Sequence, residues 1–78
     1  MKAEAISAGD SVLTPRETDV LRLVAKGTPN RVIAANLFVS EATVKTHLLH
    51  IYAKLEVRDR ASAVAVGYQR GLLVPEGR

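Results

Sequence analysis

The chain has 78 residues, of which 47% are hydrophobic and 24% are charged, and it contains no cysteine. This length allows one small hydrophobic core and leaves no room for a second domain. The absence of cysteine excludes a disulfide-stapled extracellular protein and a thiolate metal site. Eleven Lys and Arg against eight Asp and Glu give a formal charge of +3. This mild excess suits a polyanionic partner, but many ordinary proteins share it.

The sequence predicts neither a membrane span nor an export signal. The longest uncharged apolar stretch, residues 61–67, is too short to cross a bilayer, and residues 1–13 lack the apolar segment of a signal peptide. We therefore expect a cytoplasmic protein without membrane contact. Residues 1–12 are small, polar and unpatterned, which predicts a linker before a folded domain over residues 13–74. A short tail is expected over residues 75–78.

The first helix is predicted over residues 15–26 by three start signals that agree. Thr14 can cap the helix, Pro15 suits its first position, and Glu17 can accept a hydrogen bond from the backbone N–H of Thr14. Glu17 falls within the apolar sector of the helix, which its capping role explains. Gly27 is expected to end the helix. The residues that form the apolar stripe are Val20, Leu21, Leu23 and Val24.

Two further helices are predicted over residues 29–37 and 41–55. The pair Thr28-Pro29 repeats the start signal of the first helix, with Thr28 as a possible cap, and Ser40 is the expected cap of the longer helix. A short helix, a tight turn and a longer helix capped by serine form the helix-turn-helix arrangement. The shorter helix has Ile33, Ala34 and Leu37 as its expected buried face. The longer helix has a regular apolar stripe, Val44, Leu48, Ile51 and Leu55.

A fourth helix is predicted over residues 60–70, with Asp59 as its cap and Gly71 at its end. Its inward residues are expected to be Ala61, Val64, Ala65 and Tyr68. The chain shows no strand pattern, so the expected fold class is all-α, a four-helix domain that contains a helix-turn-helix.

The outer face of the third helix combines small residues with one cation and one leucine. Its members, opposite the apolar stripe, are Ala42, Lys45, Thr46, Leu49 and Ala53. A helix that enters the major groove needs small side chains for close approach, a lysine for guanine or phosphate, and methyl groups against thymine. Side chains that can donate to phosphates lie beside this face: Thr43, His47, His50 and Lys54. An ordinary solvated helix with one exposed leucine also fits the pattern, because single exposed apolar residues are common.

Several motifs lie in a fixed order along the chain. They are Leu13-Thr14-Pro15-Arg16-Glu17, Val20-Leu21, Ile33-Ala34, SEATVKTH over residues 40–47, Lys54-Leu55 and VRDR over residues 57–60. Together they resemble the LuxR-type DNA-binding domain, the output domain of NarL/FixJ-like response regulators and of quorum-sensing activators. The resemblance runs from about Leu13 to Leu73. It implies a four-helix domain that binds double-stranded DNA specifically for transcription regulation, with the third helix in the major groove.

The resemblance also implies roles for individual residues. It implies base contacts by Lys45, Thr46 and Leu49, which periodicity independently places outward. It implies backbone contacts by Thr43 and Lys54, and also by Arg58.

On the fourth helix, a second surface is expected if Val64 is at the centre of the core face. Its members are Ala63, Val66, Gly67 and Arg70. The residues alone leave a dimer surface and a solvated, alanine-rich helix equally open, and the resemblance favours the dimer. Because the surface is small, we expect a monomer or weak homodimer that pairs when it binds a two-fold-related operator.

The chain departs from the family pattern at three positions. The family usually has Ser and Glu at the start of the second helix, where this chain has Pro29 and Val32, and it usually has Gly where this chain has Glu56. If Glu56 adopts a left-handed conformation, the strain is about 1–2 kcal/mol. These departures concern stability and helix angles, because none lies on the predicted reading face.

Other function classes find less support in the sequence. No grouping of Ser, His and Asp suggests a nucleophile and no glycine-rich phosphate loop is present, so we expect neither an enzyme nor a cofactor. His47 and His50 lie one turn apart, but two ligands do not make a metal site. Two alternatives stay open. One is a helical protein-interaction module that uses Leu49 and Val66. The other is a sigma-factor-like domain that acts within RNA polymerase, so RNA polymerase is also a candidate partner.

Overall fold

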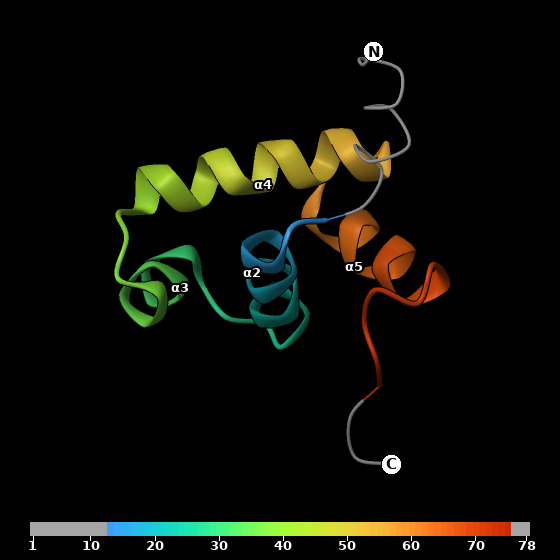
Figure 1. Cartoon of the computed structure of the whole chain (residues 1–78), viewed down its shortest axis with the longest axis horizontal. Helices are drawn as coiled ribbons and strands as arrows, with labels where there is room; N and C mark the ends of the chain where they lie inside the picture. Colours follow the sequence, from blue (N-terminus) through green and yellow to red (C-terminus); the bar gives the residue numbers. More distant parts are fainter. Residues whose placement is uncertain (1–12, 76–78) are drawn as a thin grey trace.

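The computed structural model describes residues 13–75. The linker predicted over residues 1–12, and the predicted tail apart from Pro75, lie outside the described residues. Four α-helices are present: α2 (Pro15–Ala25), α3 (Asn30–Leu37), α4 (Glu41–Leu55) and α5 (Arg60–Gln69) (Figure 1). The described part of the chain contains no strand. The all-α prediction is confirmed, and each helix begins and ends within one residue of its expected bounds.

Helix α4 lies across the other three helices. In Figure 1 it runs along the top of the molecule, with α3 below its N-terminal end, α2 below its middle and α5 at its C-terminal end. It contacts all three, and α2 also contacts α5. One face of α4 is therefore covered along its whole length, which leaves the opposite face toward solvent.

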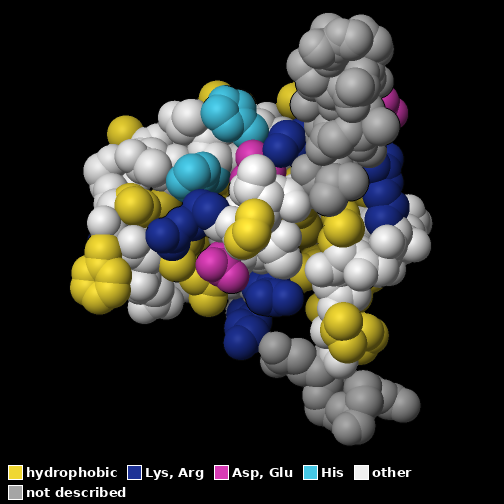
Figure 2. Space-filling view, viewed as in Figure 1, with side chains coloured by type: hydrophobic (Ala, Val, Ile, Leu, Met, Phe, Trp, Pro, Cys, Tyr) yellow, Lys and Arg dark blue, Asp and Glu magenta, His cyan; other side chains and the backbone are white. Residues whose placement is uncertain are grey.

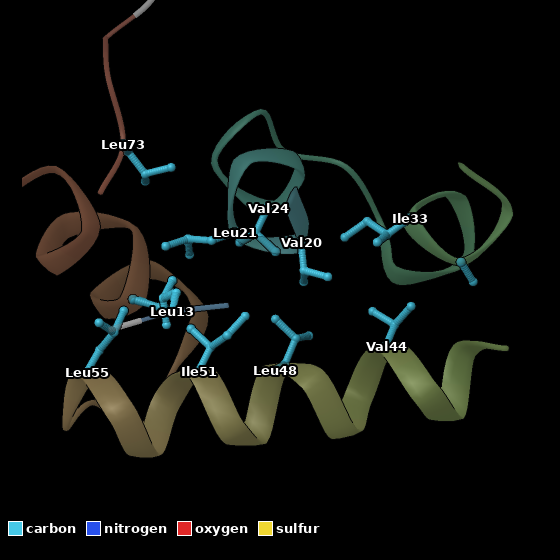
Figure 3. Packing of buried hydrophobic residues seen from close by; sticks show 12 residues of the cluster. Leu13, Val20, Leu21, Val24, Ile33, Val44, Leu48, Ile51, Leu55 and Leu73 are labelled. Atoms are coloured by element: carbon cyan, nitrogen blue, oxygen red, sulfur yellow. The ribbon is translucent and has the colours of Figure 1, made fainter. Parts of the chain in front are cut away.

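The core lies between α4 and the helices that it crosses. Val44, Leu48 and Ile51 point from α4 toward α2 and α3, and Val44 lies opposite Ile33 (Figure 3). All four residues of the predicted stripe on α4, including Leu55, are at most 5% exposed. The stripe is confirmed because large apolar side chains at helical spacing can be buried only on one face. Leu13, where the folded domain was expected to begin, is also buried.

Side-chain caps begin three of the four helices. At α2, the Thr14 hydroxyl accepts from the backbone N–H of Glu17 over 3.1 Å, and Glu17 Oε1 accepts from the backbone N–H of Thr14 over 2.9 Å. This is the predicted capping box. Ser40 caps α4 and Asp59 caps α5, each by accepting from the backbone N–H three residues later. Helix α3 differs, because its N-cap is Pro29 and no side chain caps it, so the cap predicted for Thr28 is wrong.

The core face predicted for α5 is also wrong. Ala63 and Gly67 are buried, whereas Val64 is half-buried and Tyr68 is 41% exposed. Ala61 and Ala65, also expected inward, are exposed. A Cβ at Gly67 would lie 2.8 Å from Leu73 Cδ1 and 3.1 Å from Leu21 Cδ2. Helix α5 thus packs through its smallest residues, because Leu21 of α2 and Leu73 after α5 occupy the space that larger side chains would need.

Candidate nucleic-acid interface

The outward face of α4 consists of the five residues predicted from periodicity. We call this set the recognition face: Ala42, Lys45, Thr46, Leu49 and Ala53. All five are exposed, and Leu49 is 66% exposed despite its size. None of them is acidic, and the exposed acid Glu41 lies in the first turn of the helix. The face is therefore small in profile, largely apolar and carries a single positive charge.

The two threonines of α4 near this face use their hydroxyl groups differently. Thr46 Oγ1 donates to the backbone carbonyl of Ala42 over 3.1 Å, so its hydrogen is engaged within the helix. Thr43 Oγ1 instead accepts from Ser40 Oγ over 3.0 Å, while Ser40 Oγ accepts from the Thr43 backbone N–H over 3.1 Å. Unlike the Thr46 hydroxyl, the Thr43 hydroxyl is not engaged by a backbone carbonyl, so it can donate to an external acceptor such as a phosphate oxygen.

The two histidines of α4 lie next to the recognition face. His47 is half-buried and His50 is exposed. Figure 2 shows the two histidine side chains on the surface over α4, with Lys and Arg side chains near them. Within residues 13–75, no group of three or more His, Cys, Asp or Glu is placed to hold a metal ion. The two histidines can donate to phosphate oxygens from this position.

Lys54 belongs to the core boundary between α4 and α2. Its Nζ donates to Glu17 Oε1 over 2.7 Å, and the two side chains are only 21% and 7% exposed. Burial opposes ionisation of Glu17, but the hydrogen bonds from Lys54 and the Thr14 backbone hold the pKa of Glu17 below its ordinary value of 4.5. The charge of Lys54 is thus already engaged within the domain, and its phosphate contact stays a prediction.

Two arginines occupy the start of α5 and the turn before it. Arg58 is exposed in the turn between α4 and α5, where it is open to a ligand beside α4. Arg60, which the sequence reasoning did not single out as a site residue, donates through Nη1 to Asn30 Oδ1 over 2.8 Å and through Nη2 to the Thr28 carbonyl. Arg60 therefore joins the start of α5 to the start of α3, and the VRDR motif was its only signal.

The orientation of α5 buries two of the four residues predicted to form a dimer surface. Ala63 and Gly67 are buried, and Gly67 lies against Leu21 and Leu73, so the two residues offer no surface to a second copy and their assignment to an interface is wrong. Val66 is half-buried and Arg70 is exposed. Arg70 Nη2 also donates to the Leu55 carbonyl over 3.5 Å, a long contact with the end of α4. Two of the four predicted residues are thus left at the surface.

Helices α3 and α4, a short helix and a longer capped helix joined by a tight turn, form a helix-turn-helix. The outer face of the longer helix carries no acidic residue. The family model of bacterial regulatory proteins of the luxR family matches residues 11–66. The chain belongs to this family, and it is a DNA-binding domain of transcription regulation rather than an enzyme. Among the residues described, no helix is long and apolar enough to cross a membrane.

Similar proteins include regulators from several bacteria. The transcriptional regulatory protein YhcZ of Bacillus subtilis is 59% identical over 51 residues, which are 65% of this chain and 24% of that protein. The nitrate/nitrite response regulator protein NarL of Escherichia coli is 44% identical over 57 residues, or 73% of this chain and 26% of NarL.

Among solved structures, response regulator ChrA of a heme-sensing two-component system is similar, with a TM-score of 0.77 and 48% identity. The match covers 80% of this chain and 31% of the ChrA chain. The chain spans 7–30% of the length of the curated relatives that it matches.

Proposed function

We propose that this domain binds double-stranded DNA in a sequence-specific manner, with α4 in the major groove and Lys45, Thr46 and Leu49 against the bases. The observation that carries the proposal is the contrast between the two faces of α4, one fully covered and the other exposed, small and without acids. The major groove, about 12 Å wide, admits one α-helix. Ala42 and Ala53 let the helix backbone approach the base edges closely.

Contacts to the DNA backbone come from residues beside the recognition face. We assign them to Thr43, whose hydroxyl hydrogen is available, to His47 and His50, and to Arg58 in the following turn. These contacts set the position of α4 in the groove without reading sequence. Lys54 is left out of this set, because its charge is engaged by Glu17.

Two copies of the domain pair through the exposed side of α5 on a two-fold-related operator. Val66 and Arg70 are the predicted interface residues that stay at the surface. A surface of this size is well below the ~1,200 Å² of a stable interface, so the homodimer is weak in the absence of DNA. DNA that carries two half-sites then favours pairing by mass action.

The test begins with selection of bound sequences from random duplex DNA, followed by titration at several salt concentrations. Lys45→Ala should weaken binding to the selected site by about 1–3 kcal/mol and relax the base preference at one position. Arg58→Ala should weaken all sequences about equally and reduce the salt slope by roughly one unit. Lys26→Ala, which removes the same charge from the end of α2, is the matched control and should leave the selected motif unchanged.

Binding to free duplex DNA also separates the proposal from its alternatives. A sigma-factor-like domain requires RNA polymerase for stable binding, so binding by the isolated chain argues against that class. A helical protein-interaction module would not retard DNA at all and would form a salt-insensitive protein complex. An unchanged affinity and an unchanged motif in Lys45→Ala would contradict the assignment of the recognition face.

A further inference from the structure

We infer that Leu49 reads the 5-methyl group of a thymine, and that the recognition face selects a guanine and a thymine within about two base pairs of each other. The inference rests on the proposed function, since it requires α4 in the major groove. It goes further by naming the chemical groups of the DNA that the face recognises.

Leu49 is an apolar side chain held toward the groove by the buried face behind it. It is 66% exposed, whereas its neighbour Leu48 is 5% exposed and packs in the core. Within the described part of the chain, the other large exposed hydrophobic residues, Phe38, Tyr68 and Val74, lie outside α4. Thymine is the base whose major-groove edge carries a methyl group. A leucine in the groove can therefore gain apolar contact from thymine.

The residues around Leu49 strengthen this preference because they offer few hydrogen bonds. Thr46 Oγ1 donates to the Ala42 carbonyl, which leaves the Thr46 methyl group and an acceptor lone pair for the DNA. Ala42 and Ala53 have only methyl groups. Among the five residues of the recognition face, Lys45 is the one whose side chain can donate hydrogen bonds to the DNA. Apolar contact must therefore carry much of the discrimination.

The spacing of Lys45 and Leu49 limits where the two bases can lie. Four residues of α-helix rise about 6 Å, which is close to two base-pair steps at about 3.4 Å each. A lysine in the major groove most often contacts the O6 and N7 acceptors of guanine. A guanine bound by Lys45 and a thymine bound by Leu49 must then lie within about two base-pair steps of each other.

The experiment uses the 78-residue chain and the duplex obtained by selection, with each thymine in turn replaced by deoxyuridine. This replacement removes the 5-methyl group and keeps the hydrogen-bonding edge. One such replacement, within about two base pairs of the guanine affected by Lys45→Ala, should weaken binding about fourfold, the effect of one buried methyl group. Leu49→Ala should weaken binding to the parent duplex and show no further loss with deoxyuridine at that position.

Val74→Ala is the matched control, because it truncates another exposed apolar residue that lies outside α4. It should bind as the parent does and keep the full deoxyuridine effect. The inference is overturned if the chain binds its selected duplex but no deoxyuridine replacement matters, or if Leu49→Ala retains the same sensitivity. Failure to bind any duplex would instead overturn the proposed function, and this inference with it.

Discussion

All four helices end with the same backbone motif but with different residues at its strained position. In each, one residue has a positive φ, and the next residue donates its N–H to the carbonyl five positions earlier over 2.8–3.0 Å. Helices α2 and α5 use Gly27 and Gly71, with φ of 82° and 75°. Helices α3 and α4 use Phe38 and Glu56, with φ of 60° and 59°. The left-handed conformation expected for Glu56 is thus confirmed.

The difference shows that the strained backbone positions lie in the two turns that flank α4. A side chain in this conformation costs roughly 1–2 kcal/mol, which glycine avoids. Phe38 precedes α4 and Glu56 follows it, and Glu56 also places a negative charge at the negative end of the helix dipole. Such strain persists where surrounding contacts fix the backbone. Here those contacts are the buried stripe of α4 and the Glu17–Lys54 ion pair.

The largest expected effect comes from removing the ion pair that holds the strained end of α4. Lys54→Met keeps most of the side-chain volume but leaves the buried Glu17 carboxylate without its cation. We expect the free energy of unfolding at pH 7 to fall by about 1–3 kcal/mol. Urea denaturation measures this change. Arg58→Met, which removes a charge from an exposed side chain four residues later, is the matched control and should have little effect.

The pH dependence of stability gives an independent check on the same ion pair. Because the pKa of Glu17 is lowered in the folded state, its stabilising contribution is fully present above about 4.5 and is lost as the pH falls through the lower folded value. The parent should therefore lose stability as the pH falls below 4.5. Lys54→Met removes the cation that lowers this pKa, so the variant should lose less stability than the parent over the same pH range. Parallel pH profiles for the two proteins would contradict this account.

The second-largest effect is expected from replacing the glycines that end α2 and α5. Gly27→Ala should destabilise the domain by about 1–2 kcal/mol, because alanine at φ 82° is strained. A Cβ at Gly27 would meet nothing within 4 Å, so the loss reports the backbone alone. Gly71→Ala should behave in the same way, since its Cβ would also enter open space. Thermal unfolding checks both variants, and an unchanged Tm in either would mean that the helix end relaxes without strain.

The sequence predicts α4 better than α5 for a physical reason. The stripe of α4 is made of large apolar residues, so burial and hydropathy give the same pattern. On α5 the buried residues are Ala63 and Gly67, whose small size gives almost no hydropathy signal. Gly67 is buried because Leu73, which lies beyond the end of the helix, packs against it together with Leu21. Periodicity within α5 could not reveal a contact that depends on the chain after it.

The candidate site divides in a similar way. The recognition face could be predicted because it is the complement of a clear stripe on one helix. The role of Lys54 could not, since its partner Glu17 is 37 residues away in the sequence. Its flanking position on α4 suggested only a phosphate ligand. The position of Glu17 within the apolar sector of α2 was a signal that a second partner was needed.

The smallest expected effect is a gain in stability at the two strained ends of α4. Glu56→Gly should raise the free energy of unfolding by about 1 kcal/mol, through relief of strain and loss of an unfavourable charge. Phe38→Gly should give a comparable gain, because Phe38 is 94% exposed and its ring loses little packing.

Helix α4 has 15 residues and a length of about 22 Å, so the two sites are far enough apart to act independently. Thermal unfolding of both single variants and the double variant measures each gain and their sum. A lower Tm in Glu56→Gly would show that the turn after α4 follows another path when glycine is present. A double variant that gains clearly less than the sum of its parts would show that strain at one end of α4 is transmitted through the helix to the other.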